Sequence, residues 1–225
     1  MRAPPRLRGP LAARLAILIC GLFVFAAGIV ALLESGLGLS PWDVLHQGLA
    51  EHTRLSFGEA NIVVSILVLA VAWTLGARVG VGTLANALLV GGFVQLLTSV
   101  EAISALSERG LGLRIALLAI GIALMGFGTG MYLGADLGAG PRDSLMVVGA
   151  ERTRFRLGIV RGVIELTALV VGFGLGGTVG IGTLAFALLI GPTVEGSFWL
   201  LQRASLARPA EPRPQAKSTT LPVAS

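Results

Sequence analysis

Six apolar stretches of roughly 20 residues follow one another along the chain, and they limit the possible folds more than any other feature. They lie near residues 12–34, 58–77, 81–100, 112–134, 158–177 and 181–201. A helix needs about 20 apolar residues to cross the hydrocarbon core of a bilayer. Hydrophobic residues make up 54% of the 225-residue chain and charged residues only 13%, unlike a water-soluble domain. We therefore expect an all-α membrane protein with about six transmembrane helices.

The chain also contains an internal duplication. Residues 37–94 align without gaps on residues 137–194 at an offset of 100, with about 26 identities. Each copy holds three spans, an odd number, so consecutive copies must enter the bilayer from opposite sides. The duplication thus predicts two inverted three-helix repeats, each with a short polar helix after its first span.

These boundaries predict three parts of the chain. Residues 1–11 form a basic N-terminus, and residues 12–202 form one membrane domain, with repeat one at about 12–100 and repeat two at about 112–201. Residues 203–225 hold too little apolar surface to fold and are expected to form a disordered tail.

The basic residues predict the orientation of the chain in the membrane. With a cytoplasmic N-terminus, fourteen of the 17 Lys and Arg residues lie in cytoplasmic segments, and only Arg54, Arg109 and Arg114 lie outside. Because cytoplasmic loops carry the excess of positive charge, both termini are expected in the cytoplasm. The net charge of +5 is spread between the apolar stretches instead of forming a patch with aromatics, so no nucleic-acid partner is expected.

The two short helices begin with matching motifs. Ser40-Pro41-Trp42-Asp43 and Gly140-Pro141-Arg142-Asp143 each place proline at a first helical position and a carboxylate near the positive end of the helix dipole. One interpretation is a pair of half-helices pointing toward a shared substrate site, with Asp43, Asp143 and Arg142 as contacts. The other is a pair of amphipathic helices lying flat at the membrane interface, with the aspartates only capping them.

Two charged residues lie in the fifth apolar stretch. A carboxylate such as Glu165 is costly inside a membrane unless it has a partner or faces water. Arg161 lies one turn earlier, so the pair is either an intrahelical salt bridge or a substrate or coupling site. The corresponding residues of the first copy are Ser65 and Asn61, so this charge pair is specific to the second copy.

The remaining motifs predict structure more than chemistry. Two Gly-x-Gly-Thr turns favour tight helical hairpins over an anion-binding backbone nest; they comprise Gly80, Gly82 and Thr83, and Gly180, Gly182 and Thr183. Glu51 with Arg54 and Glu151 with Arg154 have the spacing of helical salt bridges. His46 and His52 are expected to be solvated, and Cys20 to be a small buried side chain. We predict no metal site, no cofactor, no catalytic residue and no enzymatic activity.

At these motifs the chain resembles the YczE/YyaS/YitT family of bacterial integral membrane proteins, in particular its YczE-like branch. The resemblance covers about residues 11–202 and rests on Gly-Leu-Gly-Leu-Ser-Pro-Trp-Asp at 36–43, Gly-Ala-Gly-Pro-Arg-Asp at 138–143 and the two Gly-x-Gly-Thr-Leu turns. It implies a multi-pass protein of the bacterial inner membrane.

The sequence predicts a small secondary transporter or exporter, on the basis of the inverted duplication, the paired helix starts and Glu165. The alternative is a non-transporting membrane protein that acts through a protein partner in assembly or sensing. The partners expected are the lipid bilayer and an unidentified small-molecule substrate, and homo-oligomerisation is left open.

Overall fold

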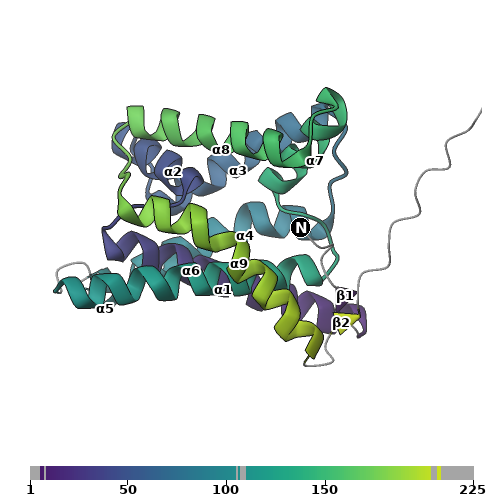
Figure 1. Cartoon of the computed structure of the whole chain (residues 1–225), viewed down its shortest axis with the longest axis horizontal. Coiled ribbons are helices and arrows are strands. Elements are labelled where there is room, and N and C mark those ends of the chain that lie inside the picture. The colour runs from purple at the N-terminus through teal and green to yellow at the C-terminus, as the bar shows by residue number, and fades with distance from the viewer. Residues whose placement is uncertain (1–5, 8, 105, 107–109, 204–206, 209–225) are drawn as a thin grey trace, which may run out of the picture.

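Six long apolar helices make up most of the computed structural model, which describes residues 6–7, 9–104, 106, 110–203 and 207–208. In chain order they are α1 (Leu11–Ser35), α3 (Phe57–Thr74), α4 (Val81–Thr98), α6 (Leu111–Gly134), α8 (Leu157–Gly174) and α9 (Ile181–Arg203) (Figure 1). Each is long and apolar enough to cross a membrane, which confirms the all-α class and the six predicted spans. Helices α3 and α8 end three residues before the predicted boundaries, because Gly76 and Gly176 adopt positive φ beyond them.

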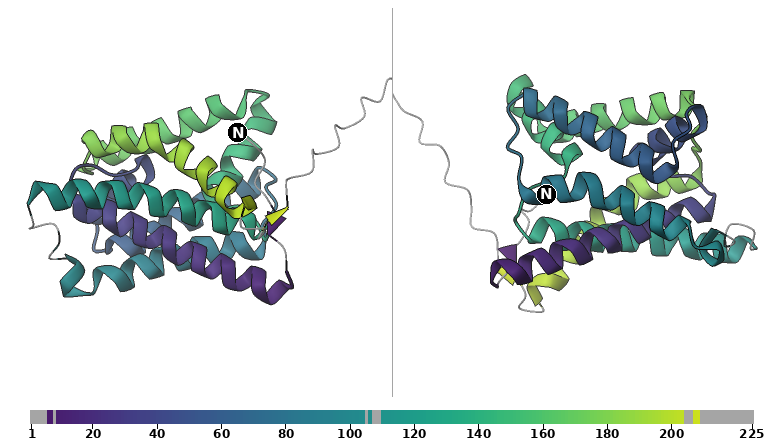
Figure 2. Two further views of the ribbon diagram at one scale, coloured as in Figure 1. Left: turned by 60° about the horizontal axis from the view of Figure 1, so that its bottom comes forward. Right: turned by 180° about the vertical axis from the view of Figure 1, so that it is seen from behind.

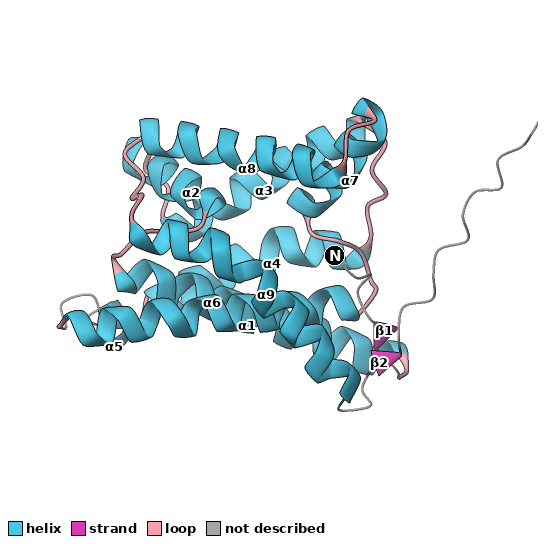
Figure 3. Ribbon diagram, viewed as in Figure 1, coloured by secondary structure: helices cyan, strands magenta, loops and turns pink. Residues whose placement is uncertain are grey.

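The shorter elements lie between and beyond these helices (Figure 3). They are α2 (Pro41–His52), α5 (Glu101–Ser104), α7 (Pro141–Thr153), and the antiparallel two-residue strands β1 (Arg6–Leu7) and β2 (Ala207–Arg208). The short helices α2 and α7 stand where the sequence predicts them. The predicted disordered tail, 203–225, lies outside the described residues except for Arg203, which ends α9, and β2.

The first helices of the two copies, α1 and α6, pack against each other more extensively than any other pair of described helices, and they run antiparallel along one side of the molecule (Figure 2). They cross where glycine faces glycine. A Cβ atom on Gly28 would lie 2.8 Å from the Gly121 carbonyl oxygen, and one on Gly128 would lie 2.7 Å from that of Gly21. Such close approach of two backbones is how membrane helices gain packing without a hydrophobic driving force. The surrounding core contains fully buried side chains including Leu22, Ile29 and Met125.

The contacts between the copies are reciprocal. Gly82 N donates to Leu137 O over 2.8 Å, and Gly182 N donates to Leu37 O over the same distance. One amide of each Gly-x-Gly-Thr turn thus bonds a carbonyl of the other copy, and the predicted tight hairpin forms in the first copy, where α3 packs on α4. Within each turn the threonine hydroxyl oxygen accepts from the first glycine N–H, at 3.2 Å for both Thr83 and Thr183.

Two arginines make a second pair of matching contacts, at the ends of α1 and α6. Arg14 of α1 donates to the carbonyls of Ala135 and Asp136 just beyond α6, at 2.8 and 2.7 Å. Arg114 of α6 donates to Ser35 and Gly36 at the end of α1, at 2.7 and 2.8 Å. Each guanidinium thus satisfies carbonyls that a helix C-terminus leaves without partners.

Two local expectations are wrong. Helix α2 ends at His52 and α7 at Thr153, so Arg54 and Arg154 lie beyond the helices, and among the described ion pairs neither bonds its predicted glutamate. Cys20 is exposed on the outer face of α1 instead of buried. Of the two interpretations of the short helices, the close packing of α2 on α8 favours the half-helix, since a Cβ on Gly48 would lie 2.5 Å from Gly172 O.

The two copies differ in how their last two helices pack. Helices α3 and α4 contact each other closely: a Cβ on Gly58 would lie 2.5 Å from Gly91 O, and the reverse distance is also 2.5 Å. The corresponding residues of α8 and α9 are Gly158 and Gly191, and a Cβ on either would meet nothing within 4 Å. Figure 1 shows α8 and α9 diverging from their connecting loop. Pro192, which removes a backbone hydrogen bond inside α9, follows Gly191 directly.

Candidate functional site

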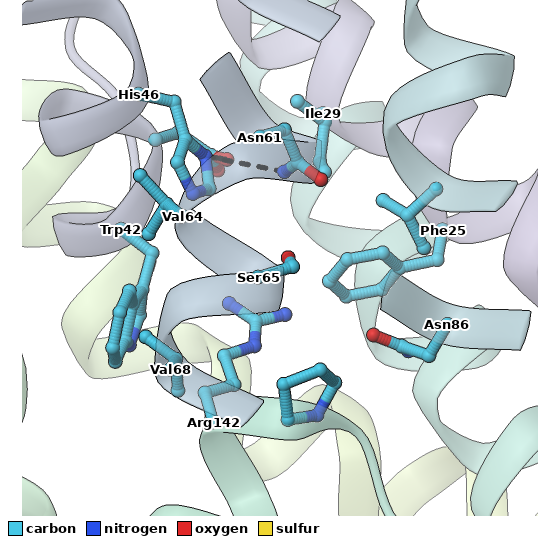
Figure 4. A pocket seen from close by; sticks show the side chains of 13 residues that line it. Phe25, Ile29, Trp42, His46, Asn61, Val64, Ser65, Val68, Asn86 and Arg142 are labelled. Atoms are coloured by element: carbon cyan, nitrogen blue, oxygen red, sulfur yellow. Dashed lines mark hydrogen bonds and ion pairs between the residues drawn. The ribbon is translucent and has the colours of Figure 1, made fainter. Parts of the chain in front are cut away.

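A cavity lies where the N-terminal ends of α2 and α7 meet, between them and helices α1, α3 and α4 (Figure 4). Its volume is about 30 Å³, enough for about two water molecules. The side chains that line it come from both copies: Phe25, Ile29, Trp42, Asp43, His46, Asn61, Val64, Ser65, Val68, Asn86, Val90, Pro141 and Arg142. The two helix starts singled out in the sequence thus contribute to one site.

Asp43 is fixed by the start of α2. Pro41 occupies the first turn, and the Ser40 hydroxyl oxygen caps the helix by accepting from Asp43 N over 3.3 Å. The Ser40 hydroxyl also donates to Asp43 Oδ2. The carboxylate is 1% exposed and lies at the positive end of the helix dipole. The predicted helix start is confirmed, and Asp43 both caps the helix and lines the cavity.

A chain of polar contacts continues from Asp43 through His46 to Asn61. His46 Nδ1 lies 3.3 Å from Asp43 Oδ1 and 3.2 Å from Asn61 Nδ2. His46 is only 4% exposed and packs edge-on against Phe57, so the expectation that it is solvated is wrong. The reason is its position one turn after Asp43, on the face of α2 that points into the bundle. His52, at the end of α2, is exposed as expected.

Arg142 reaches the same cavity from the other copy. Its guanidinium carbon lies 5.1 Å from the centre of the Phe25 ring, in a cation–π contact. Figure 4 shows the guanidinium near both Ser65 and the Phe25 ring. Arg142 is half-buried, and no carboxylate in the described part of the chain forms an ion pair with it.

Asp143 lies beside Arg142 in the chain but does not line the cavity. Its Oδ2 accepts from the buried Tyr132 hydroxyl over 2.8 Å. The two aspartates of the repeated motif therefore have different surroundings, because position 46 is histidine and the matching position 146 is methionine, which cannot hydrogen-bond a carboxylate in this way.

Arg161 and Glu165 also lie outside the cavity. Arg161 Nε donates to Glu165 Oε1 over 2.9 Å, with both side chains about one-third exposed. The structure thus contains the intrahelical pair that the spacing favours. Their counterparts in the first copy, Asn61 and Ser65, line the cavity instead.

Sequence reasoning missed the uncharged polar residues of the site. Asn86 lines the cavity, although as a polar residue of the third apolar stretch it was set aside because its counterpart is Phe186. The sequence offered no reason to select Asn61, Ser65 or Trp42, because only charged side chains were taken as signs of a site. The duplication contained a partial signal: Trp42, Asn61 and Ser65, which match Arg142, Arg161 and Glu165 of the second copy, all line the cavity.

The described residues include no cluster of three or more His, Cys, Asp or Glu side chains placed to hold a metal ion. Two buried polar atoms beside the cavity lack a hydrogen-bond partner: Trp42 Nε1 and Asn61 Oδ1. Since buried polar atoms are almost always partnered, these two atoms mark where a bound molecule or water would be held.

Comparisons with known proteins agree with the membrane fold. A family model described as "Family of unknown function (DUF6198)" matches residues 12–197. An "Uncharacterized protein" of Haemophilus influenzae is 39% identical over 181 residues, which is 80% of this chain and 81% of that protein. The "Uncharacterized membrane protein YczE" of Bacillus subtilis is 36% identical over 76% of this chain and 79% of its own length.

A third relative, the "Uncharacterized protein YyaS" of Bacillus subtilis, is 25% identical over 84% of this chain and 94% of its own length. No solved structure matches the chain. The resemblance predicted from the repeated motifs is confirmed by the family match and by these relatives. The chain therefore belongs to the DUF6198 family and is a YczE/YyaS-like multi-pass integral membrane protein.

Proposed function

We propose that this protein is a small-molecule secondary transporter or exporter of the bacterial inner membrane, built from two inverted three-helix repeats that exchange conformations. Both termini lie in the cytoplasm, and the substrate binds in the cavity between α2 and α7. The antiparallel α1 and α6 and the reciprocal contacts of the turns and arginines support the inversion. Repeats related in this way, with a site between them, are a common architecture of secondary transporters.

The observation that carries the proposal is that matching glycines of the two copies pack differently. Gly58 and Gly158 occupy matching positions, as do Gly91 and Gly191, so each copy has the residues for a close helix contact. Only the first copy makes that contact. If the repeats exchange conformations, the second copy closes at Gly158 and Gly191 while the first copy opens, and the cavity becomes accessible from the other side.

The distribution of basic residues predicts on which side of the membrane each of these helix pairs is closed or open. With the N-terminus inside, Gly58 lies at the outer end of α3, and Gly158 lies at the inner end of α8. The close α3–α4 contact then seals the outer half of the bundle, and the separation of α8 from α9 leaves the inner half open. The structure described here corresponds, in this account, to an inward-facing state.

A disulfide cross-link between Gly158→Cys and Gly191→Cys, in a Cys20→Ala background, tests the exchange. Both glycines have free space, so the new side chains fit without strain. The proposal predicts cross-linking in native membranes under mild oxidation, since α8 and α9 close during each cycle. Comparative metabolite profiling of cells before and after reduction should show solute flux lost with the cross-link and restored by dithiothreitol.

The matched control is Gly174→Cys with Gly196→Cys on the same two helices. Both positions are equally open, but Gly196 lies about 22 Å along α9 from the end that adjoins Gly174, at 1.5 Å per residue. This pair should not cross-link in either state. Absence of cross-linking at Gly158 and Gly191, in membranes where both thiols react with a small maleimide, would favour the alternative of a static protein that acts through a protein partner.

A further inference from the structure

We propose that the cavity between α2 and α7 binds the anionic oxygen group of a small solute, a carboxylate being the fitting case, and that Arg142 is its counter-ion. The inference rests on the proposed function in one respect: it names the substrate class of the same site. The contacts of three residues carry it: Arg142, Asp43 and Trp42, whose buried Nε1 donor has no partner.

The first step is the state of Arg142. A guanidinium within a membrane domain is costly unless an anion or water compensates it. Stacking on Phe25 contributes through the ring face but leaves the N–H donors in the guanidinium plane free. No carboxylate described in the structure pairs with it. The site therefore holds an uncompensated cation.

The second step is that Asp43 is not available as its partner. Although Asp43 lines the same cavity, Oδ2 accepts from Ser40 and Oδ1 lies 3.3 Å from His46 Nδ1. The carboxylate also lies at the start of α2, where the helix dipole favours negative charge. The Ser40 hydroxyl and the helix start thus compensate Asp43, and Arg142 is left to an external anion.

The third step is the unpartnered donor of Trp42. Trp42 is 7% exposed and Asn61 is 4% exposed, and both line the cavity. Trp42 Nε1 is a donor only, and it has no acceptor in the structure. Asn61 Nδ2 contacts His46 Nδ1, and Asn61 Oδ1 has no partner; as an acceptor it would bond a water or an N–H or O–H of the ligand, and not the oxyanion itself. An oxyanion held by Arg142 would supply the missing acceptor for Trp42.

The remaining walls define the rest of the ligand. Phe25, Ile29, Val64, Val68 and Val90 are apolar and surround the polar groups. The volume of about 30 Å³ has room only for the anionic group in this state, so the apolar body of the ligand requires the site to open wider. A short monocarboxylate, with one anionic end and an apolar body, matches this combination of walls and donors.

Trp42 itself provides the readout. The chain has three tryptophans, and Trp73 and Trp199 are 68% and 53% exposed. Replacing both with phenylalanine leaves Trp42 as the only indole, within the site. The protein with these two changes, in nanodiscs of zwitterionic phosphatidylcholine, is titrated with propionate and with its uncharged isostere propionamide at constant ionic strength, and Trp42 fluorescence is recorded.

We expect a saturable change with propionate and none with propionamide. Arg142→Gln should weaken propionate binding at least about tenfold, because a hydrogen-bonded ion pair is lost. Arg142→Lys should restore part of the affinity, because it keeps the charge without the two-pronged geometry. The control Arg161→Gln, which changes an arginine outside the cavity that is paired with Glu165, should leave binding unchanged.

A saturable response that survives Arg142→Gln, or one that propionamide reproduces, would overturn the inference, and so would no response in a protein that is monodisperse on size exclusion. Nanodiscs containing anionic phosphatidylglycerol distinguish the source of the anion. A signal already saturated there, without propionate, would assign the site to a lipid phosphate; an unchanged propionate titration would assign it to a soluble solute. If propionate binds but Gly158→Cys and Gly191→Cys do not cross-link, the anion site stands and the transport proposal fails. If the cross-link forms but propionate does not bind, the exchange stands and the anion site fails.

Discussion

Buried polar side chains in this protein are placed to satisfy one another across helices, and His46 is the clearest case. It bridges Asp43 on its own helix and Asn61 on α3, and thereby joins α2 to the helix that follows it. The sequence could not reveal this link. Six residues separate His46 from His52, and nothing in the spacing distinguishes the buried one from the exposed one; only the packing of α2 into the bundle does.

The first prediction concerns this bridge. His46→Ala removes the partner of a buried carboxylate and a buried amide, so the free energy of unfolding should fall by about 1–3 kcal/mol. His52→Ala, at an exposed position, should change it by less than about 0.5 kcal/mol. Thermal melting of both variants in the same detergent checks the difference. Equal melting temperatures would show that His46 contributes no stabilising contact.

At the scale of the elements, much of the fold could be predicted, because a bilayer requires long apolar helices and the duplication repeats them. The starts of α2 and α7 were also predictable, since proline at the first turn and a following carboxylate are local signals. The packing of α2 and α7 against the other helices could not be predicted. Whether such a helix lies on the membrane surface or inside the bundle depends on partners that no local pattern encodes, here the backbone contact between Gly48 of α2 and Gly172 of α8.

The second prediction concerns the crossing of α1 and α6. In Gly28→Val the new Cβ would lie 2.6 Å from Met125 Cγ and 2.8 Å from Gly121 O, so the two backbones must separate. Overpacking of this kind costs about 1–3 kcal/mol. We expect a lower melting temperature and less monodisperse protein on size exclusion. Gly162→Val, on an exposed face of α8 with nothing within 4 Å, should leave both unchanged.

On the scale of the whole molecule, the sequence and the structure carry different information. The duplication predicts two similar halves. Arg14 and Arg114 agree with it, since each bonds the end of the other copy's first helix, and so do the matching contacts of the two turns. It cannot predict that α3 packs on α4 while α8 stands apart from α9, because both copies have the same glycines at those positions. Two halves with the same contact residues but different packing are what an exchange between two states requires.

The most direct test of that exchange is a pair of spin-label distances measured by double electron–electron resonance. One pair, Val63→Cys with Leu96→Cys, reports on α3 and α4; its counterpart at the offset of 100, Val163→Cys with Gly196→Cys, reports on α8 and α9. All four positions are exposed, and each pair is placed in a Cys20→Ala background. The account predicts two distance populations for each pair. The fraction of molecules with a short α3–α4 distance should equal the fraction with a long α8–α9 distance, and the fraction with a long α3–α4 distance should equal the fraction with a short α8–α9 distance. A single, unchanging distance for both pairs, at values that differ between the copies, would contradict exchange between the repeats and with it the proposal of transport.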